Sequence, residues 1–258
     1  ALNKLPFFSP WTTRLPCFAI AHHLFGTTAF RQVSFPVALV TWASEKLIPT
    51  AYRRTPILAI SPSTKDDLVA RGIAPSNVWV VPPGVDLVVY RLSGTLDERE
   101  PIVVWVGRLE PYKRADVMIK AMLRVIEDRP DARLIIIGEG SDHGSLETMV
   151  EAAGIKEAVS FTGFVEEAEK VAWYRRAAAV VNTSEKEGWG MTMIEGNACG
   201  APSVASDVPG LRDSVRDGQT GLLVPHGDAE ALATALLRIL DDKHLSLSFA
   251  EEGLNWAK

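Results

Sequence analysis

The sequence has few cysteines and no long apolar run. Cys17 and Cys199 are its only cysteines, and neither lies in a Cys-x-x-Cys or Cys/His spacing. This excludes a disulfide scaffold and a zinc site built from neighbouring ligands, and it favours a reducing, cytoplasmic environment. No apolar run approaches the roughly 20 residues of a membrane-spanning helix, and no signal peptide is visible. The chain starts at Ala1 rather than at methionine, so we expect it to be N-terminally truncated.

Concentrated basic charge is also missing. The net charge is −5, and the two arginine pairs, at 53–54 and 175–176, are too short to form a basic patch. A nucleic-acid-binding protein normally carries a basic face or stripe, so that class is excluded. Hydrophobic residues make up 47% of the chain and charged residues 23%, which is typical of a globular protein with one large core or two moderate ones.

The chain from residue 101 onward alternates between two kinds of segment. Short, β-branched apolar runs are expected to form strands, and they lie at 102–106, 134–137, 159–161, 178–181, 203–205 and 221–224. Helical patterns separate them, at 113–128, 142–153, 166–177, 191–199, 210–216 and 228–241. Continuous apolar strands that alternate with helices predict an α/β, doubly wound parallel sheet. Ligands of such sheets bind beyond the carboxyl ends of the strands.

The first 85 residues predict a smaller parallel sheet. Strands are expected at 17–21, 57–60 and 77–81, and helices at 37–50 and 64–71, with Ser63 or Thr64 as a helix cap. Three strands make half of a Rossmann-like domain. Residues 86–100 show no clear periodicity and are predicted to be a linker. The predicted organisation is therefore a partial N-terminal domain at 1–85, a linker at 86–100 and a C-terminal domain at 101–258.

The strongest chemical motif lies at residues 187–195. Glu187 and Glu195 are separated by seven residues, and Gly188 and Gly190 precede an apolar, helix-like run. A glycine-rich turn that enters a helix presents free backbone N–H groups to a phosphate. Glu195, about one turn into the helix, could accept hydrogen bonds from ribose hydroxyls. Taken alone, the motif is equally compatible with two solvated charges at a helix entry.

A second motif follows the strand expected at 102–106. Arg108 and Lys113 flank a turn at the carboxyl end of that strand, where two cations could neutralise a diphosphate. An exposed basic loop is the alternative. The sequence contains no Asp-x-Asp segment and no His/Cys cluster, so no metal ligand set is predicted.

Several motifs together resemble the group 1 (family 4) retaining glycosyltransferases. They occur in the order expected for that family, at 60–65, 81–86, 106–108 with Lys113, 161–165 and the E-x7-E segment 187–195, and the resemblance covers roughly residues 16–241. Members have the GT-B fold, in which two Rossmann-like doubly wound parallel-sheet domains face each other, and here the first would be incomplete. The chain departs from the family pattern at Trp189, which is usually Phe, and at Gly196-Asn197, which is usually Ala-Met. These departures question the fit of the sugar or acceptor rather than the class of activity.

The resemblance implies a role for each matching residue. Arg108 and Lys113 should bind the donor diphosphate, and Glu195 the ribose. Glu187 should contact the transferred sugar, and a histidine after the 17–21 strand should reach the same sugar, with His22 slightly favoured over His23. The remaining implied contacts are backbone N–H groups at Gly190, Met191 and Thr192 for sugar and phosphates, and a nucleobase pocket at 161–165 that includes Phe164 and Val165. Core packing is an equally good interpretation of Phe161 and Phe164.

The implied activity is metal-independent transfer of a hexose from a UDP-, GDP- or ADP-sugar, with retention at the anomeric carbon and without a cofactor. The acceptor would be a carbohydrate or a lipid-linked molecule, and a cytoplasmic enzyme with peripheral membrane association would suit the latter. Two alternatives stay open: a nucleotide-sugar epimerase on the same fold, and a nucleotide-sugar-binding fragment without catalysis. The second follows if the truncated chain is inactive because the start of its first domain is missing.

Overall fold

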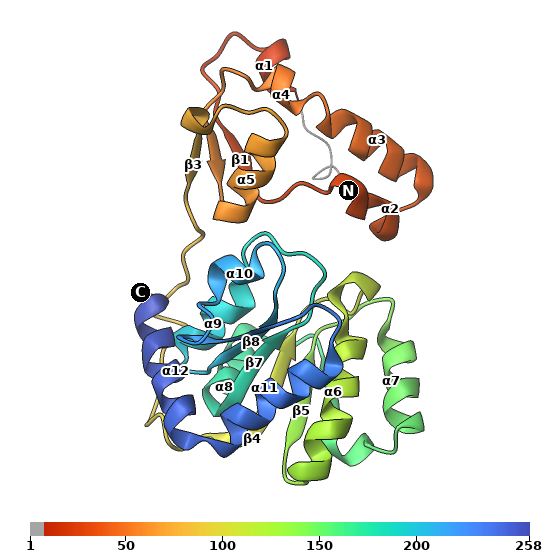
Figure 1. The fold of residues 1–258 in the computed structure, drawn as a ribbon, viewed down its shortest axis with the longest axis vertical. Helices are drawn as coiled ribbons and strands as arrows, with labels where there is room; N and C mark the ends of the chain where they lie inside the picture. The colour runs from red at the N-terminus through yellow and green to blue at the C-terminus, as the bar shows by residue number, and fades with distance from the viewer. Residues whose placement is uncertain (1–7) are drawn as a thin grey trace. The chain divides into compact units, whose positions relative to one another are not determined.

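A computed structural model of the protein describes residues 8–258, which divide into two compact units, one that ends at Pro83 and one that spans Gly84–Lys258 (Figure 1). Each unit contains its own parallel sheet and its own hydrophobic core. Among the helices in residues 8–258, none combines the length and the apolar character needed to cross a membrane.

The first unit is built on a three-stranded parallel sheet in the order β1-β2-β3. Its strands are β1 (Ala19–Ala21), β2 (Ile57–Ala59) and β3 (Val78–Val80). Its helical segments are α1 (Ser9–Thr12), η2 (Gly26–Thr28), α2 (Ala29–Gln32), α3 (Phe35–Glu45), α4 (Ile48–Ala51), α5 (Pro62–Ala70) and η3 (Pro75–Asn77). All three predicted strands are present, each shorter than expected.

Two local predictions for this unit were wrong. The single helix expected at 37–50 is broken into α3 and α4, because Pro49 has no N–H to donate to the carbonyl of Glu45. The cap of α5 is Ser61, whose Oγ accepts a hydrogen bond from the backbone N–H of Thr64 at 3.1 Å, rather than Ser63 or Thr64 itself. Pro62 then takes the first helical position, where its missing N–H costs nothing.

The second unit contains a six-stranded, fully parallel sheet in the order β6-β5-β4-β7-β8-β9. The strands are β4 (Glu100–Val106), β5 (Arg133–Ile137), β6 (Val159–Gly163), β7 (Ala177–Asn182), β8 (Ser203–Ser206) and β9 (Gly221–Val224). The doubly wound sheet expected from the sequence is therefore confirmed, and each strand lies within two residues of its predicted bounds.

Helices cover both faces of this sheet (Figure 1). They are α6 (Ala115–Asp128), α7 (His143–Ala152), α8 (Glu167–Arg176), α9 (Met191–Ala198), α10 (Leu211–Ser214), α11 (Ala229–Asp241) and α12 (Lys243–Trp256), with 3-10 turns η4 (Pro111–Lys113) and η5 (Lys156–Ala158). Alternate residues of β4 point to opposite faces: Val103 and Trp105 pack with α6 and α11, and Val104 packs with α8 and α9. This two-sided burial explains why the strands are apolar throughout.

Two features of the second unit differ from the sequence prediction. Residues 86–100, expected to be a linker, belong to this unit: Tyr90 is buried in its core, and Arg99 donates hydrogen bonds to the carbonyls of Ala177 and Cys199, both at 2.8 Å. Side-chain contacts rather than regular periodicity hold this segment, so the sequence pattern did not reveal it. Helix α12, for which no helix was predicted, starts at an Asp242 cap and packs against α9 and α11.

Candidate functional site

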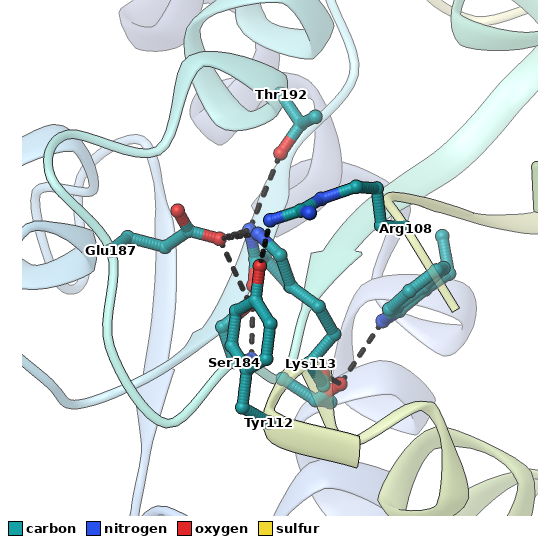
Figure 2. Close-up of polar contacts among 9 residues, drawn as sticks. Arg108, Tyr112, Lys113, Ser184, Glu187 and Thr192 are labelled. Carbon is teal, nitrogen blue, oxygen red and sulfur yellow. Dashed lines mark hydrogen bonds and ion pairs between the residues drawn. The ribbon is translucent and has the colours of Figure 1, made fainter. Parts of the chain in front are cut away.

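A cluster of polar side chains lies where the strand order of the second unit reverses. From β4 the chain proceeds outward through β5 and β6, and then returns to the other side of β4 to form β7. Beyond the carboxyl ends of these two adjacent strands lie residues from four segments: Arg108 and Lys113 after β4, Asn182 and Ser184 at the end of β7, Glu187 in the next loop, and Thr192 in α9 (Figure 2). Ligands of doubly wound sheets bind at such switch points.

Hydrogen bonds fasten the backbone of Lys113 to the end of β7. Trp105 donates from Nε1 to Thr183 Oγ1 at 3.0 Å, and the same hydroxyl donates to the carbonyl of Lys113 at 2.9 Å. The backbone N–H of Glu185 donates to the carbonyl of Tyr112 at 2.9 Å. The turn that carries Lys113 therefore has a fixed position relative to the loop that carries Glu187.

Glu187 receives all its side-chain hydrogen bonds on one carboxylate oxygen. Lys113 Nζ lies 2.5 Å from Oε1, Ser184 Oγ donates to it at 2.9 Å, and Asn182 Nδ2 donates at 3.3 Å (Figure 2). Within residues 8–258, no side chain donates to Oε2. Burial would raise the pKa of Glu187, but Lys113, Ser184 and Asn182 together hold this pKa below its ordinary value. The carboxylate is thus ionised at neutral pH and keeps one oxygen available to a ligand.

Gly190 directs the start of α9 into the same cluster. Its φ of +90° lies in the region that favours glycine, and a Cβ there would approach Ser214 Oγ to 2.7 Å. As the residue before Met191, it leaves the N–H groups of Met191 and Thr192 without intrahelical acceptors, whereas the N–H of Met193 donates to the carbonyl of Gly190 at 3.0 Å. Such a helix start attracts a phosphate or another anion.

Glu195, the second glutamate of the 187–195 motif, lies in α9 and has two partners that the sequence analysis missed. Tyr174 OH donates to Glu195 Oε2 at 3.0 Å, and Lys170 Nζ lies 3.2 Å from the same oxygen. The Glu195 side chain is only 12% exposed. Lys170 and Tyr174 occur four residues apart within the helix predicted at 166–177, so their shared face could have been found from the sequence, but its contact with α9 could not.

Arg108 is the exposed member of the cluster. Its guanidinium donates a hydrogen bond to Tyr112 OH, and Lys113 Nζ lies 5.4 Å from the centroid of the Tyr112 ring. Figure 2 shows the three side chains next to one another. Arg108 and Lys113 thus both lie beside Tyr112, and their predicted role in binding a diphosphate stays a prediction.

The remaining predicted positions are less closely tied to this cluster. Phe164 is 73% exposed, whereas Val165 is partly buried against the core next to α8. Phe161 packs into the opposite core and contacts the ring of His143, so it has a packing role. The nucleobase pocket at 161–165 stays a prediction.

His22 lies in the first unit, directly after β1. It is exposed, and its backbone carbonyl accepts a hydrogen bond from Thr64 Oγ1 at 3.2 Å. The ring of His23 contacts Phe25. The catalytic role suggested for His22 stays a prediction. In the part of the chain that the structure describes, no three His, Cys, Asp or Glu side chains form a group suited to a metal ion.

Comparison with known proteins identifies relatives of both sequence and structure. The family model described as "Glycosyl transferases group 1" matches residues 90–256. The chain is 34% identical over 203 residues to the D-inositol 3-phosphate glycosyltransferase 2 of Catenulispora acidiphila, which covers 72% of this chain and 48% of that protein. It is 33% identical over 212 residues to the D-inositol 3-phosphate glycosyltransferase of Rhodococcus jostii, with 76% and 47% covered. The chain thus spans about half the length of the curated relatives it matches.

Solved structures show the same architecture. Anabaena Alr3699/HepE, in complex with UDP and glucose, has a TM-score of 0.80 at 20% identity, and the match covers 95% of this chain and 67% of that one. The sucrose-phosphate synthase of Thermosynechococcus elongatus has a TM-score of 0.78 at 25% identity, with 96% and 64% covered. The first likeness, at its low identity, concerns the fold alone.

Proposed function

Since the chain belongs to the group 1 glycosyltransferase family, we propose that its second unit binds a nucleoside diphosphate-sugar and that the protein transfers this sugar to an acceptor. The GT-B fold expected from the sequence is confirmed by the structural neighbours. The donor, the acceptor and the stereochemistry of transfer are parts of the proposal.

The observation that carries the proposal is the convergence of charge at the β4/β7 switch point. Lys113, Arg108 and the open N–H groups at the start of α9 supply positive potential for a diphosphate, and Glu187 lies beside them with one uncommitted oxygen. A diphosphate with an attached sugar matches this arrangement of positive groups beside a carboxylate. Its phosphate oxygens accept hydrogen bonds from the cations, and its sugar hydroxyls donate to the carboxylate. An exposed basic loop would not place Lys113 within 2.5 Å of a half-buried glutamate.

The proposed reaction retains the configuration of the anomeric carbon. The acceptor hydroxyl attacks on the face from which the nucleoside diphosphate departs, and the departing phosphate oxygen takes the hydroxyl proton. Arg108 and Lys113 stabilise the charge that develops on the leaving group, which is the contribution a metal ion makes in other transferases, so we propose that transfer needs no metal. Glu187 Oε2 would hold a hydroxyl of the transferred hexose.

An epimerase on the same fold is the second candidate, and the site does not favour it. Epimerisation needs an acid and a base that exchange protons with a sugar carbon or hydroxyl. Glu187 is instead held ionised by Lys113, Ser184 and Asn182, which suits binding and charge stabilisation better than proton exchange at neutral pH. Incubation with donor alone distinguishes the two, because an epimerase converts the sugar nucleotide without an acceptor.

Known relatives suggest where to begin the search for substrates. Structural neighbours were solved with UDP and with UDP-glucose, so we propose a UDP-sugar as the first donor to test, followed by GDP- and ADP-sugars. D-inositol 3-phosphate, from the names of the relatives, joins carbohydrates and lipid-linked sugars as an acceptor to test. A cytoplasmic location with peripheral membrane association would fit a lipid-linked acceptor.

The deciding experiment measures donor binding and product configuration. Thermal shift with UDP-, GDP- and ADP-sugars should reveal one base that stabilises the fold by mass action. NMR of the product should then show the anomeric configuration of the donor. If none of the three nucleotides stabilises the protein, the proposed donor site is wrong; if the product is inverted, the retaining mechanism is wrong.

A further inference from the structure

We infer that Tyr174 and Lys170 are positioning residues that occupy Oε2 of Glu195 and leave Oε1 to accept both hydroxyls of the donor's ribose. The inference rests on the proposed function, because it takes Glu195 as the ribose-binding carboxylate. It adds a source of discrimination between ribonucleotides and deoxyribonucleotides, located on α8 rather than on the glycine-rich loop.

The geometry of the donors supports this assignment. Each carboxylate oxygen has two lone-pair sites. Tyr174 OH donates to Oε2 at 3.0 Å, and the Lys170 ammonium forms an ion pair with the same oxygen at 3.2 Å, so both protein contacts of the carboxylate meet Oε2. No other side chain in residues 8–258 forms a hydrogen bond or an ion pair with Glu195, which leaves the two sites of Oε1 for a ligand. Two adjacent acceptor sites match the neighbouring 2′- and 3′-hydroxyls of a ribose.

The side chains of Tyr174 and Lys170 are themselves held in place. Tyr174 is fully buried, and its burial together with the nearby Glu195 raises its pKa well above the ordinary value, so its hydroxyl keeps the proton it donates. Lys170 Nζ lies 5.2 Å from the centroid of the Tyr90 ring, a contact that does not involve the Tyr90 hydroxyl. Helix α8 carries Lys170 and Tyr174 one turn apart, so a single helix face fixes the orientation of the Glu195 carboxylate.

Glu187 shows the same arrangement. Its three donors also meet one oxygen and leave the other without a protein donor among the described residues. A carboxylate with neither oxygen held by the protein can rotate and offer its hydrogen-bond sites in several directions. Fixing one oxygen removes this freedom before the ligand arrives, which improves selectivity by preorganisation.

The test compares UDP with 2′-deoxy-UDP by calorimetry on the 258-residue chain, and repeats the comparison with the ADP and GDP pairs. The wild-type protein should bind the ribonucleotide at least roughly tenfold more tightly, the effect of one hydrogen bond to a charged group. Tyr174→Phe should reduce this ratio to about threefold or less, because the carboxylate can then turn Oε2 toward the ligand. A role limited to packing would weaken both nucleotides equally and leave the ratio unchanged.

Tyr90→Phe is the matched control. It removes a buried hydroxyl from the same cluster, but one that donates to Glu167 rather than to Glu195, so the ratio should stay at the wild-type value. Lys170→Met provides a second variant in case Tyr174→Phe does not fold, and it should also reduce the ratio. Lys156→Met, which removes an exposed lysine, should not.

The possible failures are distinguishable. If none of UDP, ADP and GDP binds, the proposed function is wrong and the inference with it. If UDP and 2′-deoxy-UDP bind the wild-type protein equally, the proposed nucleotide site is supported, but Glu195 is not the residue that binds the ribose. If the wild-type protein discriminates and Tyr174→Phe and Lys170→Met both keep the full ratio, Glu195 binds ribose without their help and the inference is overturned.

Discussion

The pair formed by Lys113 and Glu187 should respond to substitution with opposite signs. The two side chains are only 16% and 19% exposed, and their charged atoms lie 2.5 Å apart. Lys113→Met removes a cation from the phosphate site and leaves the Glu187 carboxylate without its countercharge. We expect UDP binding to weaken by about 2 kcal/mol, roughly 30-fold, which is the effect of one lost charged hydrogen bond.

Glu187→Gln should have the reverse effect on UDP. The amide keeps an oxygen that can accept from Ser184, removes the negative charge beside the phosphates and releases Lys113 for the ligand. We expect unchanged or tighter binding, by up to about 1 kcal/mol. The double variant should bind UDP more tightly than Lys113→Met alone, because it no longer carries a carboxylate without a countercharge. The coupling free energy of this double-mutant cycle should reach about 1 kcal/mol.

Isothermal titration calorimetry with UDP on the four proteins measures these effects, and thermal unfolding checks that each variant folds. Lys156→Met serves as the control for loss of a lysine, since Lys156 and its partner Glu151 are both exposed, at 73% and 62%. The reasoning is refuted if Glu187→Gln weakens UDP binding as strongly as Lys113→Met does. The pair would then be a structural unit whose loss distorts the site, rather than two opposite charges near a phosphate.

Three further predictions concern the same site. Arg108→Ala should weaken nucleotide binding by ~1.5–3 kcal/mol in calorimetry, and Arg124→Ala, in α6, should not; equal affinities would assign Arg108 to a solvated loop. Binding of the donor, and transfer by the active protein, should survive EDTA, and restoration of a lost activity by Mn²⁺ or Mg²⁺ would contradict metal independence. Gly190→Ala should cost about 1–3 kcal/mol in urea unfolding because of its positive φ and the close Ser214 Oγ, whereas Gly144→Ala, which meets no atom within 4 Å, should be neutral or stabilising.

Strand positions could be predicted from the sequence because burial on both faces makes them apolar without interruption. The apolar, β-branched runs that became β4 and β5 are short and lie between glycine-rich turns, which favours strands over helices. Residues 86–100 and α12 could not be predicted in this way. Their positions depend on individual contacts, such as the Arg99 guanidinium on the carbonyls of Ala177 and Cys199, which no periodic pattern encodes.

The candidate site shows a similar division. Glu187, Glu195, Arg108 and Lys113 could be singled out because several motifs occur together in the order expected for the group 1 family, whereas each motif alone also allowed solvated charges. Their donors could not, since the sequence does not reveal which oxygen of a carboxylate a neighbouring strand or helix will reach. Ser184 and Asn182 lie close to Glu187 in sequence, yet without β7 in place nothing directs both of them to the same oxygen.

This convergence on one oxygen leads to a prediction about pH. The pKa of Glu187 is lowered from 4.5 in the folded protein, because Lys113, Ser184 and Asn182 outweigh the effect of burial. A lowered pKa stabilises the fold above the unfolded-state pKa, and this stabilisation is lost as pH falls through the folded-state pKa. The difference in unfolding free energy between the wild-type protein and Glu187→Gln should therefore be larger at about pH 7 than at about pH 3, because acidification protonates the carboxyl more readily in the unfolded chain than in the fold. Urea unfolding at both pH values measures it. A difference that stays constant, or grows on acidification, would mean that burial dominates and that Glu187 is not held ionised by its neighbours.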